Sequence, residues 1–354
     1  MLSETGPRVV YWLGAGASAK ALPTVNIMPQ ALTVQAEQLR RIYGPDDQIR
    51  EELNAYEKKL KELADLSISY GSLDTYARSL YLQADKADEL AELKLHLSMY
   101  FVLAPAVVFA PPPVMLGLEE YRAAYDLDPR YMGWLAVLLN NDLGLNPRVK
   151  VISWNYDFQV ELALGRYFKP GALDQVHERC KIYPSSGHHK IDEGNFFLAH
   201  LNGIAGQEKR GSSFHPWYRS HVGFFPDWIT GLFKVYGKAD HIGQKMRVGF
   251  EERLTFAWEA KPVAEGAIRM GEAALREAEV LVIIGYSFPA FNRLIDKRLI
   301  AAFDDGPKPK RLVLQNRNAT RDGFLNLFDV DQNRLSISVD TNPDQFHLPN
   351  ELFL

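Results

Sequence analysis

Small and polar residues follow each of the short apolar runs of this 354-residue chain. Amide and carboxylate oxygens can order water and stabilise positive charge, and glycine turns let a backbone approach a phosphate closely. The residues that recur in this way are Gly14, Gly16, Ser18, Asn155, Asp157, His200, Asn202, Gly203, Gly285, Tyr286, Ser287, Gln315 and Asn316. Open parallel sheets bind ligands outside the carboxyl ends of their strands. If the runs are strands of one sheet, the pattern predicts a nucleotide cleft.

The first cluster, Gly14 to Ala19, reads G-x-G-x-x-A. Its glycines permit a tight turn, so that loop amides and the N-terminus of the next helix can face a pyrophosphate. The same string can also be a glycine turn whose small residues only pack a helix. The acidic residue that holds the ribose about 20 positions further on in dehydrogenases is missing. A standard dehydrogenase is therefore not expected.

The elements that must position these residues alternate along the chain. The apolar runs are 8–13, 149–153, 196–201, 280–284, 312–314 and, more weakly, 335–339. Of the runs after the first, all but 196–201, which follows irregular chain, come after a helical pattern, as βαβ units require. We predict an α/β fold with a doubly wound, parallel, Rossmann-like sheet.

Long helical patterns, such as Asp47 to Leu66, fill the block from Pro29 to Leu139. The sequence therefore predicts a nucleotide-binding domain from 1–28 and 140–354 with a large helical insertion at 29–139.

The composition excludes several classes of protein. The net charge of −4 gives no overall positive field that would attract the phosphate backbone of nucleic acid. The one basic run, 308–311, is expected at the solvated start of a strand. Phe101 to Leu118 is uncharged, but Pro105 and three prolines at 111–113 interrupt it, so we expect a buried helix end and a turn rather than a membrane span. The single cysteine, Cys180, and the lack of a signal peptide favour the cytoplasm.

Four ordered motifs resemble those of sirtuin-like proteins. They are Gly14-Ala15-Gly16-Ala17-Ser18 with Leu22-Pro23, then Trp154-Asn155-Tyr156-Asp157, His200-Leu201-Asn202-Gly203 and Ile284-Gly285-Tyr286-Ser287-Phe288-Pro289. The resemblance covers the predicted sheet from Arg8 to about Asn318 and leaves out the helical insertion. It is closest to the bacterial NAD hydrolases of antiphage defence systems.

The resemblance implies a role for each motif. The turn with Ala15 and Pro23 would hold the pyrophosphate of NAD, Asn155 and Asp157 would face the nicotinamide ribose and order the attacking water, and the adenosine side would be lined by Gly285, Ser287 and Asn316. The side-chain oxygens of Asn155 and Asp157 suit the positive charge that develops when an N-glycosidic bond breaks. Asn155 or Asp157 could instead, or also, cap the helix expected from Phe158.

The chain departs from the family at three places. Asn202 stands where sirtuins have a histidine that bonds the ribose hydroxyls. His200, roughly 6 to 7 Å away on the same strand face, could replace that histidine or lie buried beneath the cleft. A lone cysteine cannot build the four-cysteine zinc module of the deacylases, and residues 25–28 replace their Pro-Asp-Phe-Arg stretch. No zinc and no peptide deacylation are expected.

The sequence thus predicts an NAD hydrolase that releases nicotinamide and ADP-ribose, with Asn155, Asp157, His200 and Asn202 as its catalytic residues. Its rival is a catalytically impaired NAD- or ADP-ribose-binding sensor or scaffold subunit. For both, the expected partners are a homo-oligomer or an assembly with a defence NTPase or nuclease, without direct contact to nucleic acid.

Overall fold

The computed structural model describes residues 8–43, 49–107, 127–168, 176, 179–184, 194–210, 213–217, 229–234, 236, 253–259, 261–305 and 309–353. The chain forms two compact units, one of residues 1–18, 128–204 and 255–354 and the other of residues 19–127 and 205–254. These bounds differ from the predicted limits at 28/29 and 139/140, which stay a prediction for the extent of the domains.

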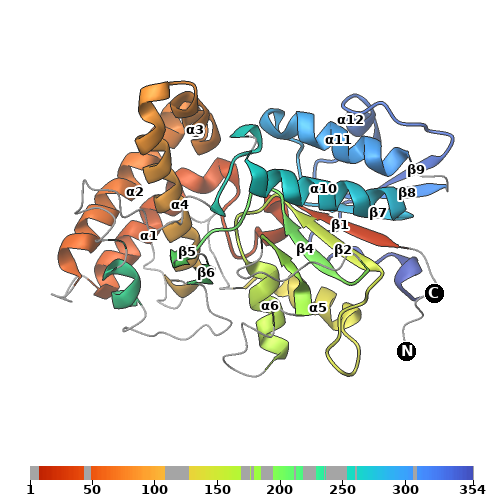
Figure 1. Cartoon of the computed structure of the whole chain (residues 1–354), viewed down its shortest axis with the longest axis horizontal. Coiled ribbons are helices and arrows are strands. Elements are labelled where there is room, and N and C mark those ends of the chain that lie inside the picture. Colours follow the sequence, from red (N-terminus) through yellow and green to blue (C-terminus); the bar gives the residue numbers. More distant parts are fainter. Residues whose placement is uncertain are drawn as a thin grey trace. The chain divides into compact units, whose positions relative to one another are not determined.

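The first unit contains a seven-stranded, wholly parallel sheet in the order β3-β4-β2-β1-β7-β8-β9 (Figure 1). Its strands are β1 (Val9–Leu13), β2 (Val149–Ser153), β3 (Ile182–Tyr183), β4 (Phe197–His200), β7 (Val280–Ile284), β8 (Lys310–Gln315) and β9 (Leu335–Asp340). Apart from the edge strand β3, the chain winds outward from β1 first through β2 and β4, then through β7, β8 and β9 on the other side. This is the doubly wound Rossmann order, and the predicted fold class is confirmed.

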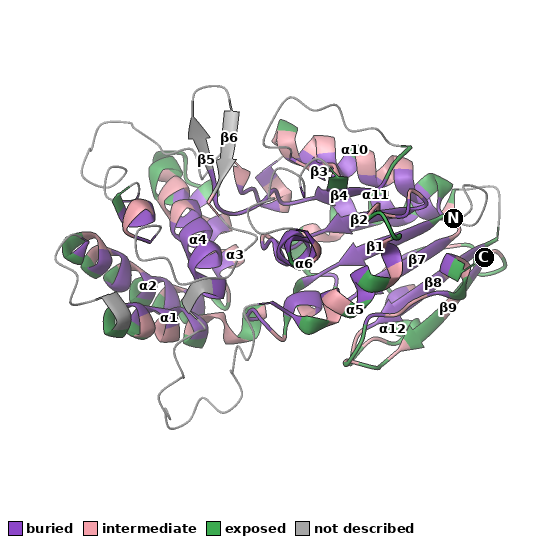
Figure 2. Ribbon diagram, turned by 90° about the horizontal axis from the view of Figure 1, so that it is seen from below, coloured by how far each residue is buried: buried purple, intermediate pink, exposed green. Residues whose placement is uncertain are grey.

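Helices cover both faces of this sheet, and this explains why the central strands β1 and β7 are continuously apolar. Trp12 packs in one core with Ile268 of α10 (Pro262–Glu277) and Leu299 of α11 (Arg293–Asp304). Its neighbour Tyr11 points to the other face, where its ring lies 5.1 Å from that of Trp134. Trp134 belongs to α5 (Pro129–Leu138), which with α6 (Gln159–Tyr167) forms the second layer (Figure 2). β1, β2, β4 and β7 are buried at every residue.

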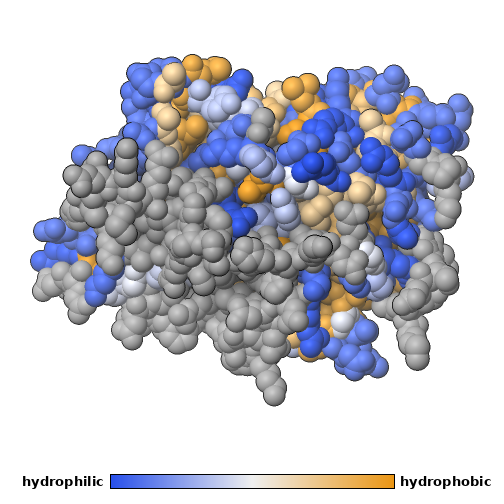
Figure 3. All heavy atoms as spheres, in the orientation of Figure 1, coloured by the Kyte–Doolittle hydropathy of each residue, from blue (hydrophilic) through white to orange (hydrophobic). Residues whose placement is uncertain are grey.

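The second unit is mainly helical. It consists of α1 (Met28–Tyr43), α2 (Arg50–Tyr70), α3 (Leu73–Tyr81), α4 (Ala87–Val107) and an antiparallel hairpin of β5 (Gln207–Arg210) and β6 (Ser213–Pro216). Gly71 ends α2 in the left-handed conformation, and the Ser72 side chain caps α3. Large apolar side chains at the end of α2 and just after α3, including Ile68 and Leu82, are exposed, and Figure 3 shows apolar atoms on this surface.

The other helical elements whose bounds the structure describes are short. They are α12 (Arg321–Leu325) and the 3-10 turns Ala15–Ser18, Val25–Ile27, Ala84–Lys86, Ala257–Glu259, Ala290–Asn292 and Asn350–Phe353.

The strands β3, β5 and β6 were not predicted, because strands of two to four residues carry no clear hydrophobic periodicity. α4 covers the start of the 101–118 stretch, whereas 108–118 lies outside the described residues. Among the described helices, none has the length and apolar character needed to cross a bilayer.

Candidate functional site

The carboxyl ends of five strands are level with one another. Leu13 pairs with Ser153 on one side and with Ile284 on the other. Ser153 pairs with His200, and Ile284 pairs with Gln315. The polar residues that follow these strands therefore gather at one edge of the sheet, as the sequence predicted.

The loops that follow β1 and β7 are bonded directly to each other. Gly14 N donates to Ile284 O at 2.9 Å, and Gly16 N donates to Gly285 O at 2.8 Å. A Cβ on Gly16 would lie 2.7 Å from the Gly285 Cα, and one on Gly14 would lie 2.7 Å from the Tyr286 Cα. The packing of two backbones thus explains both glycines of the first motif.

Gly285 completes this contact in a conformation that side chains rarely adopt. Its φ is 63°, and a Cβ there would lie 2.3 Å from the carbonyl carbon of Gly16. The contact joins the ends of β1 and β7, the point where the strand order reverses and where doubly wound sheets bind nucleotides.

This geometry changes what the glycine turn can offer to a pyrophosphate. The amides of Gly14 and Gly16 serve the contact with β7, so a ligand would be held by other groups of the turn, such as the exposed Ala15. The expected helix N-terminus is also different, since Ala15 to Ser18 form only a four-residue 3-10 turn and the next α-helix begins at Met28. Pyrophosphate binding by this turn stays a prediction.

An arginine that sequence reasoning missed holds the turn from behind. Arg130 Nη2 donates to Gly16 O at 2.9 Å and to Ala17 O at 3.1 Å. The same guanidinium is paired with Asp128, the N-cap of α5, at 2.6 Å, and only 8% of its side chain is exposed. No motif marked Arg130, because it lies in a stretch assigned to the helical insertion.

Ser18 is the point where the predicted site residues meet. Asn155 Nδ2 donates to Gly14 O at 3.0 Å and lies 3.4 Å from Ser18 Oγ. Ser18 Oγ is also 3.2 Å from the Tyr131 hydroxyl and hydrogen-bonds the Asp157 carboxyl. Three segments of chain distant in sequence are therefore joined through one buried hydroxyl.

Asp157 combines a capping role with an unusual pKa. Its Oδ1 accepts the Gln159 amide at 3.0 Å at the start of α6, as the capping interpretation expected. Burial raises the pKa of Asp157 to about 6, although the Gln159 amide, the Ser18 hydroxyl and nearby His200 oppose the rise. A carboxyl with a pKa near neutrality suits acid or base catalysis.

His200 ends β4 with both ring nitrogens bonded inside the protein. Its Nδ1 lies 3.1 Å from Asn155 O and its Nε2 lies 3.1 Å from Glu161 Oε1. A carbonyl only accepts, so Nδ1 carries a proton, and Nε2 faces the Glu161 carboxyl. Burial lowers the pKa of His200, but the charge and hydrogen bond of Glu161 outweigh it, and the pKa is raised overall. With 2% of its surface exposed, His200 has the geometry of the buried alternative, supporting Asn155 from below.

Asn202, at the position of the family histidine, is 6% exposed and keeps an unused acceptor. Its Nδ2 lies 3.5 Å from Trp154 O, whereas its Oδ1 has no hydrogen-bond donor within the described part of the chain. A buried oxygen left without a donor costs about 1 to 3 kcal/mol. A hydroxyl of a ligand would remove that cost.

Two of the residues expected on the adenosine side, Asn316 and Ser287, differ in their contacts. Asn316 Nδ2 donates to Tyr286 O at 3.2 Å, next to the bond from Gly285 N to Gln315 O at 2.8 Å, while Ser287 is exposed. Pro23, which was expected to help hold the pyrophosphate, is buried and belongs to the second compact unit.

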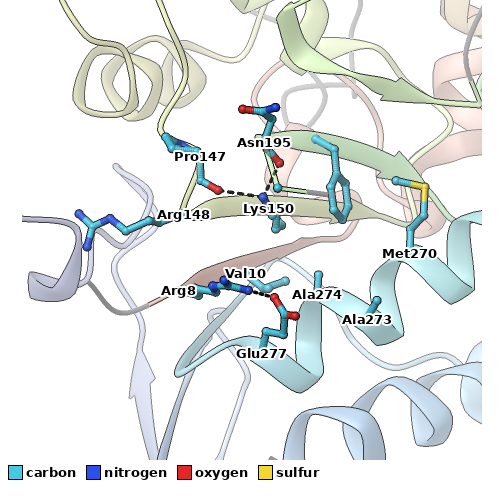
Figure 4. Close-up of a pocket in the computed structure, with 12 residues that line it drawn as sticks. Arg8, Val10, Pro147, Arg148, Lys150, Asn195, Met270, Ala273, Ala274 and Glu277 are labelled. Atoms are coloured by element: carbon cyan, nitrogen blue, oxygen red, sulfur yellow. Dashed lines mark hydrogen bonds and ion pairs between the residues drawn. The ribbon is translucent and has the colours of Figure 1, made fainter. Parts of the chain in front are cut away.

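A cavity of about 560 Å³ lies at the opposite, amino edge of the sheet (Figure 4). It is lined by Arg8, Val10, Pro147, Arg148, Lys150, Gly194, Asn195, Phe197, Met270, Ala273, Ala274 and Glu277. Its cations are bonded within the protein, since Arg8 pairs with Glu277 and Lys150 Nζ donates to Pro147 O at 2.8 Å. None of the predicted site residues lines it.

The chain resembles solved structures of Sir2 enzymes. One, with a deacetylated p53 peptide and 3'-O-acetyl ADP-ribose, is 13% identical, with 96% of this chain and 90% of that chain covered and a TM-score of 0.35. A second, bound to a propionylated peptide, is 11% identical, with 96% and 89% covered and a TM-score of 0.35. A third, described for the mechanism and regulation of Sir2 enzymes, is 13% identical, with 96% and 89% covered and a TM-score of 0.37. No protein-family model and no curated protein matches the chain. At such low similarity, functional residues have to be argued from this chain alone.

Proposed function

We propose that this protein is a sirtuin-like NAD hydrolase that releases nicotinamide and leaves ADP-ribose. The observation that carries the proposal is the convergence of Ser18, Asn155 and Asp157 on the Gly14 turn, where the strand order of the sheet reverses. A carboxyl whose pKa burial raises to about 6 stands there beside amide and hydroxyl groups. These are the groups that hydrolysis of an N-glycosidic bond requires.

In the proposed reaction the bond between the ribose C1' and the nicotinamide nitrogen breaks, and its electron pair neutralises the positive pyridinium. Water forms the new bond to C1' and gives its proton to the Asp157 carboxylate, which passes it to solvent. The products are nicotinamide, ADP-ribose and one proton.

The other residues hold this arrangement in place. Asn155 keeps the Gly14 turn against the end of β2, and His200 in turn supports the Asn155 carbonyl. The unused Oδ1 of Asn202 would accept a ribose hydroxyl. Asn202 and His200 would thus share the work that one histidine performs in sirtuins.

The biological setting follows from the motif resemblance alone. It is defence against phage, in a homo-oligomer or together with an NTPase or nuclease whose signal switches NAD cleavage on. Zinc has no part in the proposed chemistry.

The experiment is incubation with NAD and direct measurement of nicotinamide, alone and with the candidate partner proteins. Asn155→Ala should lower the rate about 10² to 10³-fold, because the hydrogen bond that holds the Gly14 turn in place for the transition state is lost. His200→Ala is its companion. A comparable rate loss would place His200 in the chemistry, and a fall in thermal stability alone would place it in the core.

The second candidate is a binding module that has lost turnover. It is favoured by the replacement of the family histidine with Asn202 and by the complete internal bonding of the His200 ring. ADP-ribose or NAD would then bind, as calorimetry would show, while nicotinamide release would equal that of Asn155→Ala. That outcome would replace the hydrolase with a sensor or scaffold subunit.

A further inference from the structure

A buried carboxyl lies beneath the carboxyl edge and links two of its loops. Asp296, on α11, is fully buried. Its Oδ1 accepts Trp154 Nε1 at 3.1 Å, and both of its oxygens lie 3.0 Å from the Tyr286 hydroxyl. Trp154 follows β2 and Tyr286 follows β7, so one side chain connects the ends of two strands that are not neighbours in the sheet.

The aromatic rings around Asp296 pack against one another, so that a shift of Asp296 would displace them together. The rings of Trp154 and Tyr286 are stacked, with centroids 6.2 Å apart, and Trp12 of β1 lies 5.7 Å from the ring of Tyr286. Tyr286 also forms the wall against which Gly14 packs. A shift of Tyr286 or Trp154 would therefore move the Gly14 turn or Asn155, which directly follows Trp154.

The carboxyl of Asp296 is surrounded by hydrogen-bond donors. The Tyr286 hydroxyl lies equally far from its two oxygens and donates to them, and Trp154 Nε1 donates to Oδ1. Asn292 Nδ2 donates to the same tyrosine oxygen at 2.9 Å. An asparagine at 296 would keep Oδ1 as the acceptor for Trp154 Nε1 and the Tyr286 hydroxyl.

We propose that Asp296 is a positioning residue of the nucleotide site, which holds Trp154 and Tyr286 together and thereby fixes the loops that carry Asn155 and Gly285. The inference rests on the proposed function only for the identity of the ligand, which is NAD or ADP-ribose. The link between the loops is a property of the described side chains themselves.

The electrostatic surroundings support the protonated form. Burial raises the pKa of Asp296 to about 8, against the hydrogen bonds from Tyr286 and Trp154 and the charge of Arg293. Tyr286 itself is held neutral, because burial and the nearby Asp296 raise its pKa. The link should therefore weaken as the pH passes about 8.

The experiment compares Asp296→Asn and Asp296→Ala with Lys297→Ala, a control at the exposed neighbour on the same helix. One readout is the indole N–H signal of Trp154 in an NMR spectrum, assigned with Trp154→Phe. The other is the affinity for ADP-ribose between pH 6.5 and 9. We expect Asp296→Asn to keep the signal and an affinity within about threefold of the wild type, and Asp296→Ala to shift the signal and weaken binding by about tenfold or more. Wild-type affinity should fall above pH 8, whereas that of Asp296→Asn should stay level.

An unchanged indole signal and affinity in a folded Asp296→Ala protein would overturn the proposal. If Asp296→Ala does not fold, Tyr286→Phe removes only the hydroxyl and must still shift the Trp154 signal. An unchanged signal in Tyr286→Phe would also overturn the proposal. Wild-type protein that binds neither NAD nor ADP-ribose would contradict the proposed function instead, and the indole signal would still decide the role of Asp296.

Discussion

The two edges of the central sheet both bury ionisable side chains, but the partners of these side chains differ. At the amino edge, Lys150 Nζ donates to Pro147 O, and Lys310 Nζ donates to Arg276 O at 2.9 Å at the end of α10. At the carboxyl edge, Asp157 accepts the Gln159 amide at the start of α6, and Asp296 accepts from the side chains of Trp154 and Tyr286, which follow two different strands. The cavity of about 560 Å³ lies at the first edge and the convergent groups lie at the second.

Lys310 shows how far the amino edge departs from expectation. The basic run was expected at the solvated start of a strand, yet Lys310 is 4% exposed, and burial lowers its pKa to about 8. Its Nζ satisfies carbonyls that the end of α10 leaves without partners. Lys308, in the same run, lies outside the described residues.

Asp157→Asn tests the carboxyl edge most directly and should have the largest effect. We expect nicotinamide release to fall by about 10² to 10⁴-fold with ADP-ribose affinity retained, because the amide cannot accept a proton. Since the base must be ionised, wild-type turnover should rise as the pH passes about 6 and then level off. Equal rates in the two proteins would remove Asp157 from the chemistry.

Gly285→Ala tests whether the contact between the loops after β1 and β7 is essential. A Cβ would meet Gly16 at 2.3 Å in a left-handed residue, so the free energy of unfolding should fall by about 2 to 4 kcal/mol, with loss of ligand binding. Gly133→Ala in α5 is the matched control, because its Cβ meets nothing within 4 Å. There the free energy of unfolding should rise by up to about 1 kcal/mol. Urea unfolding of both variants decides; similar losses would show that loop packing is not the cause.

Asp296→Asn gives a pH-dependent difference in stability. The folded pKa of about 8 lies above the ordinary value near 4, so the folded state holds this proton more tightly. The stabilisation from Asp296 is thus complete below about pH 4, declines as the pH rises and is gone above about 8. The free energy of unfolding of wild type minus that of Asp296→Asn should fall by roughly 2 to 3 kcal/mol between pH 6 and 8. A difference that stays constant over this range would mean that Asp296 is not protonated in the fold.

Arg8→Gln at the amino edge should have the smallest effect. Arg8 and Glu277 form an ion pair whose side chains are 52% and 62% exposed, and such pairs contribute about 0 to 1 kcal/mol. Nicotinamide release should be unchanged. A marked loss of activity would mean that the amino-edge cavity belongs to the function after all, and would undo the contrast between the two edges.

Much of the sheet was determined by the sequence itself. The runs 149–153 and 280–284 match β2 and β7 residue for residue, because strands buried on both faces are rich in β-branched and other apolar residues, although β2 also contains Lys150 and Ser153. The polar residues after each run were placed correctly at one edge, since parallel strands bring their carboxyl ends together. These features depend on local pattern and on topology rules that hold for all such sheets.

What each site residue touches was decided only by the tertiary structure. The motif glycines could not be read as a contact between Gly16 and Gly285, because 268 positions separate the two and only the strand order makes them neighbours. Arg130 and Asp296 belong to no motif, and each acts through partners brought close by helix packing. The raised pKa of Asp157 likewise comes from burial, which no local pattern encodes. Sequence determines which groups reach the edge of the sheet, and packing across distant segments determines their partners and their protons.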